Sequence, residues 1–359
     1  MFNAQKTHAI CMGFLFYKQF KTNKMKNLEF AEKFTRLVIA KMSEIESDWE
    51  IPWLFERRKN FIPANITGRK YRGGNTLMLL LHLMFSQKYI TPVFMTFKQA
   101  KERGLNILKG AGSFPVYYYL FRVIDNETKD VVDYNDYVEF SDSEKDKYNV
   151  FVVPKHYNVF NIQDTNFEQV YPEKWAELIK KYRTEINYSN ENELYSNEII
   201  DSLLRDKNWV CEIKIQKSDE AYYLPSKDYI VNPLKMQFKK GEAFYSTLLH
   251  EMAHSTGHES RLNRKGGKIS GDFEYGREEL VAELTSALVC FYLGISSSIR
   301  EENVSYLKGW IENIKQKPDF LMTILAEVSK ASEFIINNLG MDYLYENEDF
   351  DIEAAKEAA

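Results

Sequence analysis

The stretch Phe244-Tyr-Ser-Thr-Leu-Leu-His250-Glu251-Met-Ala-His254-Ser-Thr-Gly257 carries two histidines four positions apart, with a glutamate directly after the first. Successive helical residues are rotated by about 100°, so side chains four positions apart project from nearly the same side. His250 and His254 can therefore bind one metal ion, and Glu251 can act as general base for a water at an open coordination position. Zinc lowers the pKa of such a water to about 7, so the pattern predicts a hydrolytic zinc site.

Apolar residues surround the two histidines, as a buried helix at an active site requires: Tyr245, Leu248, Leu249, Met252 and Ala253. We expect this helix to span 241–256. Gly257 is expected to end it, because glycine adopts the left-handed conformation at a helix terminus at little cost.

A zinc site needs a third protein ligand, and several residues compete for that place. Glu279 and Glu283 lie four apart in a helix predicted for 277–291, so one can bind the metal while the other supports a ligand histidine. We favour Glu279 as ligand and Glu283 as support, although Glu283 lies nearer the apolar stripe of that helix. His258, just beyond the motif helix, is a second candidate or an outer support. Glu278 is a third, but it points to a different side of its helix.

Length and composition favour two globular domains. The chain has 359 residues, of which 44% are hydrophobic and 14% aromatic, enough to form sizeable cores. Cys11, Cys211 and Cys290 lie far apart without a Cys-x-x-Cys pair, so we expect free thiols in a reducing, cytoplasmic compartment. No apolar run approaches the roughly 18 residues that span a bilayer, so we expect no membrane association.

Composition along the chain suggests where the domains begin and end. We expect an N-terminal extension over 1–27, a first domain over 28–165, a linker over 166–195, a second domain over 196–345 and an acidic tail over 346–359. In the first domain, 75–85 reads as a buried helix, and 115–124, 148–154 and 156–162 read as strands. In the second, helices predominate, and two short strands around a turn are expected within 221–233. The fold class is therefore α+β.

Between Glu56 and Gly110 the chain carries eleven lysines or arginines and two acids, with aromatic residues interleaved. Cations neutralise phosphates and aromatic rings stack on unpaired bases, so this composition suits single-stranded nucleic acid. The alternative is that the aromatic residues form the core and the cations a solvated rim.

Over most of its length the chain resembles the ArdC-type antirestriction proteins of plasmids and other mobile elements. The N-terminal resemblance rests on Asn65-Ile-Thr-Gly-Arg-Lys-Tyr-Arg-Gly-Gly-Asn75, Thr96-Phe-Lys-Gln-Ala100, Leu108-Lys-Gly110 and Val159-Phe-Asn-Ile162. The C-terminal resemblance rests on Ala221-Tyr-Tyr-Leu-Pro225, on 250–264 and on Glu278-Glu-Leu-Val-Ala-Glu283. Ala111-Gly112-Ser113 and the acidic segment 125–147 depart from the family pattern.

The resemblance implies an N-terminal α+β domain that binds single-stranded DNA and a mainly helical, zincin-like metallopeptidase domain of the gluzincin type with a small sheet. It implies zinc, or another divalent ion such as manganese, as cofactor, with single-stranded DNA and a protein substrate as partners. Tyr222 and Tyr223 would lie on an edge strand that pairs with an extended peptide. The residues expected to contact DNA are Trp53, Arg69, Tyr71, Arg72, Asn75 and Lys98.

Two other functions remain compatible with the sequence. The chain could be a DNA-coating protein without proteolytic activity, whose metal site is structural. It could also be a peptidase whose basic domain recognises an acidic protein.

Overall fold

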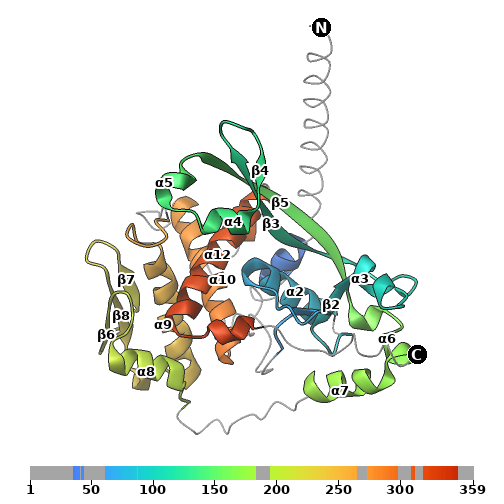
Figure 1. The fold of residues 1–359 in the computed structure, drawn as a ribbon. Helices are drawn as coiled ribbons and strands as arrows, with labels where there is room; N and C mark the ends of the chain where they lie inside the picture. The colour runs from blue at the N-terminus through green and yellow to red at the C-terminus, as the bar shows by residue number, and fades with distance from the viewer. Residues whose placement is uncertain are drawn as a thin grey trace. The chain divides into compact units, whose positions relative to one another are not determined.

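The computed structural model describes residues 35–40, 42–43, 61–86, 88–182, 195–264, 273–297, 309–311 and 318–346. Two compact units are distinguished: 1–29 with 113–159, and 30–112 with 160–359. The expected extension over 1–27 and residues 347–359 of the expected tail lie outside the described residues. The fold class is α+β, as predicted from the sequence (Figure 1).

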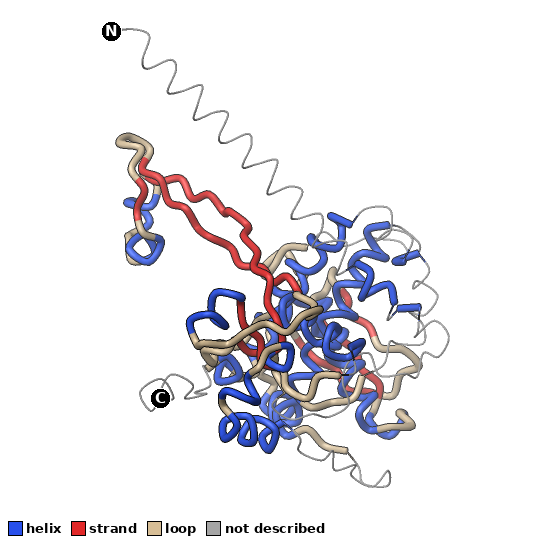
Figure 2. Tube along the Cα trace, turned by 90° about the vertical axis from the view of Figure 1, so that its right-hand side faces the viewer, coloured by secondary structure: helices blue, strands red, loops and turns tan. Residues whose placement is uncertain are grey.

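The described part of the first unit is built around a ribbon of two long strands, with a third, short strand paired to one of them. β3 (Phe114–Asp125) and β5 (Tyr148–Asn161) are antiparallel, with pairing that runs from Phe114 opposite Val159 to Asp125 opposite Tyr148. Figure 2 shows these two long strands side by side. The short strand β4 (Val131–Val132) and the helices α4 (Tyr134–Val138) and α5 (Asp142–Lys145) lie between them in sequence. The prediction of two strands within 148–162 was wrong, because β5 is one continuous strand. A proline such as Pro154 has no N–H to donate, and a strand tolerates it at a position where pairing needs no donor.

The second unit begins with a pair of short parallel strands, β1 (Ala64–Asn65) and β2 (Val93–Thr96). They are joined by α2 (Gly73–Ser86), whose largely apolar sequence makes it a buried helix, as predicted. Helix α3 (Phe97–Glu102) follows β2 directly. Because neighbouring parallel strands end at the same edge of a sheet, the segments after β1 and β2 leave from the same place.

Part of the segment expected to be a linker is folded. It contains α6 (Phe167–Val170) and α7 (Pro172–Tyr182), and Phe167 is completely buried. The ring of Tyr182 meets that of Phe61 edge to face, with centroids 6.0 Å apart. Residues 183–194 lie outside the described residues.

The C-terminal part consists of a small sheet and packed helices. After α8 (Glu198–Asp206), the strands lie in the order β6 (Glu212–Gln216), β8 (Tyr229–Pro233), β7 (Tyr222–Leu224). β7 and β8 match the two expected strands, whereas β6, parallel to β8, was not predicted. Helix α9 (Gly241–Thr256) packs against α10 (Phe273–Leu293), and α10 packs against α12 (Pro318–Asn338). Among the described residues, no helix is both long and apolar enough to span a bilayer.

Helix α2 also packs closely on α12. The backbone N–H of Gly74 donates a hydrogen bond of 2.8 Å to Ser329 Oγ. Gly73 has a φ of +51°, and a Cβ added there would lie 2.4 Å from Ser329 Oγ. Glycine at position 73 is therefore required by both the backbone conformation and the helix contact.

We expect Gly73→Ala to lower the free energy of unfolding by more than the cost of the left-handed backbone conformation alone. The left-handed conformation costs a non-glycine residue about 1–2 kcal/mol, and overpacking adds about 1–3 kcal/mol. Gly104→Ala is the matched control, because Gly104 has a φ of +68° with nothing within 4 Å of the added Cβ. Urea unfolding of both variants measures the difference, and equal losses of stability would contradict the predicted clash.

Candidate metal centre

Helix α9 presents its histidines to a buried interior. His250 is 1% exposed and Glu251 3% exposed, and the apolar residues predicted to surround them are buried. The helix ends at Thr256, close to the predicted boundary. The prediction of a left-handed conformation at Gly257 was wrong, because its φ is −76°. A Cβ added there would lie 3.0 Å from Arg264 Nη2, so a larger residue would crowd that guanidinium.

Three side chains from α9 and α10 converge. The Nε2 atoms of His250 and His254 lie 3.0 Å apart. Glu279 places Oε2 3.4 Å from His250 Nε2 and Oε1 3.4 Å from His254 Nε2. An ion held tetrahedrally by bonds of about 2.1 Å keeps its ligand atoms about 3.4 Å apart. These separations are close to the spacing that a zinc-sized ion requires, so the three residues could hold one.

The other ring nitrogen of each histidine faces a carboxylate. His250 Nδ1 lies 3.6 Å from Glu283 Oε1, and His254 Nδ1 lies 3.4 Å from Glu278 Oε1. A carboxylate at Nδ1 favours a proton on that nitrogen and leaves the lone pair of Nε2 directed at the metal position. Glu283 thus lies where support for His250 was expected.

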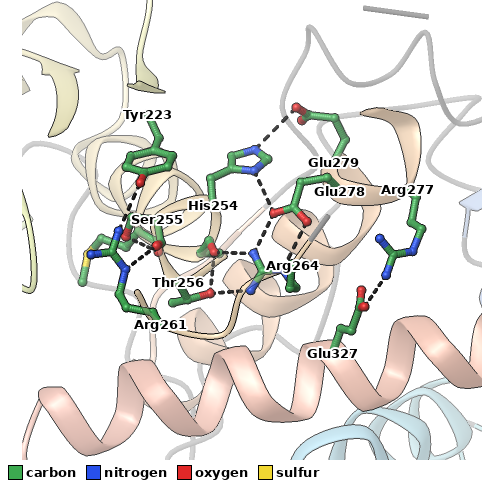
Figure 3. Close-up of polar contacts among 12 residues, drawn as sticks. Tyr223, His254, Ser255, Thr256, Arg261, Arg264, Arg277, Glu278, Glu279 and Glu327 are labelled. Carbon is green, nitrogen blue, oxygen red and sulfur yellow. Dashed lines mark hydrogen bonds and ion pairs between the residues drawn. The ribbon is translucent and has the colours of Figure 1, made fainter. Parts of the chain in front are cut away.

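Sequence reasoning missed the role of Glu278, which it placed on a different side of α10 from Glu279. The two neighbouring carboxylates reach opposite nitrogens of one ring, because the His254 imidazole inserts between them (Figure 3). Glu278 directly precedes the predicted ligand Glu279 in the sequence, and this adjacency could have indicated its place at the centre.

Arg264 fixes Glu278 in turn. Its guanidinium donates to both Glu278 oxygens, at 3.1 and 2.6 Å, and to the carbonyl oxygen of Ala253 at 2.8 Å (Figure 3). A further hydrogen bond of 2.6 Å joins it to Thr256 Oγ1. The segment after α9 therefore folds back to hold the outer partner of His254 in a bidentate ion pair.

The centre concentrates negative charge. Glu251, Glu279 and Glu283 are buried and Glu278 is nearly so. Burial opposes ionisation of the His254 ring, but the carboxylates of Glu279 and Glu278 outweigh it and raise the pKa of His254 to about 10. Burial likewise opposes ionisation of Glu279, but both histidines hold its pKa well below the usual range. A divalent cation bound here would offset this concentration of carboxylates.

A second polar cluster joins the small sheet to the end of α9. Tyr223 donates a 2.7 Å hydrogen bond to Asp228, and Arg261 contacts both residues and the carbonyl oxygen of Ser255 (Figure 3). β7, which carries Tyr223 and the exposed Tyr222, is an edge strand of its sheet. His258 turns away to Ser260, whose hydroxyl lies 2.8 Å from its Nδ1.

The residues expected to contact DNA have different environments. Arg69 and Lys98 are exposed, and Asn75 is half-buried. Arg72 lies 3.8 Å from Glu333, and Tyr71 packs edge-on against Phe94 while its hydroxyl lies 3.3 Å from the Asn65 side chain. Tyr71 therefore supports the loop instead of presenting both faces of its ring. Trp53 lies outside the described residues.

Both halves of the chain match known protein families. Residues 28–160 match the family described as the N-terminal domain of anti-restriction factor ArdC. Residues 200–327 match the zincin-like metallopeptidases. The chain belongs to the ArdC-type family. The metal-binding geometry lies in the zincin-like part of this ArdC-type protein.

Solved structures show the same fold. The antirestriction protein ArdC from plasmid R388, in its metal-free form, superposes with a TM-score of 0.57 at 23% identity, covering 86% of this chain and 97% of that protein. Its Mn(II)-bound form gives the same TM-score and identity, covering 85% and 97%. At this identity, the likeness of the ArdC-type chain to both forms is one of fold.

Related sequences occur in larger proteins. A DNA primase TraC of Escherichia coli is 29% identical over 308 residues, which cover 86% of this ArdC-type chain and 27% of the primase. The chain therefore spans about a quarter of that relative's length. The uncharacterized protein y4eC of Sinorhizobium fredii is 23% identical over 308 residues, covering 85% of this chain and 90% of y4eC.

Proposed function

We propose that this ArdC-type protein binds single-stranded DNA through its N-terminal domain and hydrolyses peptide bonds at a zinc centre formed by His250, His254 and Glu279. The observation that carries the proposal is the convergence of these three side chains, together with the buried Glu251 that directly follows His250 and acts electrostatically on His254. Histidine and carboxylate ligands select weakly among divalent ions, so manganese is an alternative cofactor.

When bound, zinc supplies a Lewis acid that polarises a carbonyl group and makes a water acidic near neutral pH. Glu251 accepts the proton of the attacking water and delivers it to the leaving amine. Glu283 and Glu278 keep the two imidazoles oriented through their Nδ1 atoms. The open edge of β7 offers backbone groups that align an extended peptide by strand pairing.

The basic N-terminal segment supports the proposed DNA binding. Residues 61–112 contain eight lysines or arginines and one acid, Glu102. A protein named DNA primase TraC and an antirestriction protein of a plasmid are among the similar proteins. We therefore propose that the protein binds the DNA of a mobile element while that DNA enters a new host. In the described residues Cys211 and Cys290 are free, which agrees with a cytoplasmic site of action.

The second candidate function is DNA coating without proteolysis, with a structural metal. Burial of Glu251, which is 3% exposed, favours this alternative, because a general base has to reach substrate. One result separates the two functions. If the protein is a peptidase, replacing Glu251 abolishes peptide hydrolysis and leaves DNA binding unchanged, whereas a DNA-coating protein has no hydrolysis to lose.

The DNA-binding part predicts a steep salt dependence. Each phosphate contact contributes a slope of about −0.7 in a plot of log affinity against log salt for single strands. We expect the double variant Arg69→Ala, Lys98→Ala to reduce the magnitude of this slope by about 1.4. Fluorescence anisotropy with a labelled thymidine oligonucleotide measures it, and Lys147→Ala, an exposed lysine of the ribbon, is the control.

Two results would contradict this proposal. Affinity for the single strand that does not change with salt would exclude phosphate contacts as its source. Tighter binding to duplex than to single-stranded DNA would exclude recognition of unpaired bases.

A further inference from the structure

The basic segments on either side of α2 come together at one edge of the β1–β2 pair. Ala64 pairs with Val93 and Asn65 with Phe94 in parallel register. The loop 66–70 leaves the carboxyl end of β1, and α3 begins at the carboxyl end of β2. Arg69 is carried by the first of these segments and Lys98 by the second, so the topology places two cation-bearing segments side by side.

A reciprocal amide pair locks these segments together. Asn65 Nδ2 donates to Gln99 Oε1 at 3.1 Å, and Gln99 Nε2 donates to Asn65 Oδ1 at 2.8 Å. Asn65 Oδ1 also accepts from the backbone N–H of Thr67 at 3.1 Å, and Gln99 Oε1 accepts from that of Thr96 at 2.9 Å. Both amides are thereby bound to their own segment and to each other, which makes the spacing between the segments rigid.

Phe97 stands on this locked framework with its ring in solvent. Its side chain is 63% exposed, and that of the adjacent Lys98 is 86% exposed. The hydrophobic effect disfavours such exposure of a ring. Lys98 Nζ lies 3.7 Å from Glu102 Oε1, an exposed ion pair that a phosphate can replace. A stacking partner that brings phosphates with it would cover the ring and bind the flanking cations.

Phe151, an exposed aromatic residue of the ribbon, has a different charge environment. On the ribbon, Phe151 is 51% exposed, but residues 113–159 contain nine acids and five lysines or arginines. Phosphates are repelled from such a surface, whereas residues 61–112 have the opposite balance. Charge therefore selects Phe97 over Phe151 as the ring that a nucleic acid covers.

We propose that Phe97 is the face on which a base of single-stranded DNA stacks, with Arg69 and Lys98 binding the adjacent phosphates and the Asn65–Gln99 pair setting their spacing. This inference rests on the proposed binding of single-stranded DNA. Stacking on a ring tolerates every base, so the site takes single strands without strong sequence preference.

The test compares the full-length protein with Phe97→Ala, Phe97→Leu and Phe97→Trp. Binding to a thymidine oligonucleotide is expected to weaken by about fivefold to 150-fold in the alanine variant, the equivalent of about 1–3 kcal/mol of stacking. The leucine variant is expected to lose most of this affinity as well, because an aliphatic side chain has no π-face, and the tryptophan variant to retain it. Phe151→Ala is the matched control and is expected to bind as wild type does.

An oligonucleotide of the same length with abasic residues separates stacking from every other effect. Wild type and Phe97→Ala are expected to bind it equally, since no base is present. If Phe97→Ala binds the thymidine strand as tightly as the wild type does, the inference is overturned and the proposed DNA binding still holds. This result is expected if Phe97 contacts another protein instead. Failure of the wild type to bind any single strand overturns the proposed function itself.

Discussion

Replacing Glu251 by glutamine is expected to leave zinc binding unchanged while peptide hydrolysis falls by about 10²–10⁴-fold, the usual contribution of a general acid–base group. Glutamine has the shape of glutamate but accepts no proton at neutral pH, and Glu251 is not one of the three converging ligands. The measurement is turnover of fluorescently labelled, unfolded casein by the zinc-loaded protein, alongside zinc stoichiometry by mass spectrometry. Glu259→Gln, an exposed glutamate beyond the same helix, is the control.

The pattern of results separates the proposed functions. Unchanged hydrolysis in Glu251→Gln would rule out the assigned general base. If the zinc-loaded wild type cleaves nothing while it binds single-stranded DNA, the DNA-coating function with a structural metal is correct. Loss of zinc from Glu251→Gln would mean that Glu251 is itself needed to hold the ion.

Local periodicity explains which parts of the site were predictable. His250 and His254 lie four residues apart in one helix, so their proximity follows from helix geometry alone. The boundaries of α9 were likewise predicted closely from apolar spacing. A single element contains all the information that such predictions need.

Contacts between elements could not be predicted in this way. Glu278 and Arg264 meet through the packing of α10 on α9 and through the return of the chain after Gly257, and neither is encoded by a spacing. Strand β6 was missed because its paired residues in β8 lie seventeen positions further along the chain. The amide pair that places Phe97 beside the loop after β1 joins residues 34 positions apart.

The choice between Glu279 and Glu283 shows the limit most clearly, because both lie on one face of α10 and the apolar stripe pointed towards Glu283. The packing of the helices favours Glu279. Glu279 faces the Nε2 atoms of both histidines, whereas Glu283 faces only Nδ1 of His250. A carboxylate at Nδ1 can orient a ligand histidine, whereas a carboxylate that faces both Nε2 atoms can itself bind the ion, so we propose Glu279 as the ligand.

We therefore expect Glu279→Ala to weaken zinc binding by more than 100-fold and Glu283→Ala by about 10–100-fold, the usual effect of losing an outer partner of a ligand. Competition with a chromophoric chelator measures both affinities, and Glu259→Ala serves as the control. Alanine is used because a glutamine could still ligate through its carbonyl oxygen. The expected order reflects geometry: the first variant removes a carboxylate whose two oxygens each lie 3.4 Å from one of the Nε2 atoms, and the second removes an oxygen 3.6 Å from His250 Nδ1. The reverse order would make Glu283 the ligand and would require α10 to turn about its axis relative to α9.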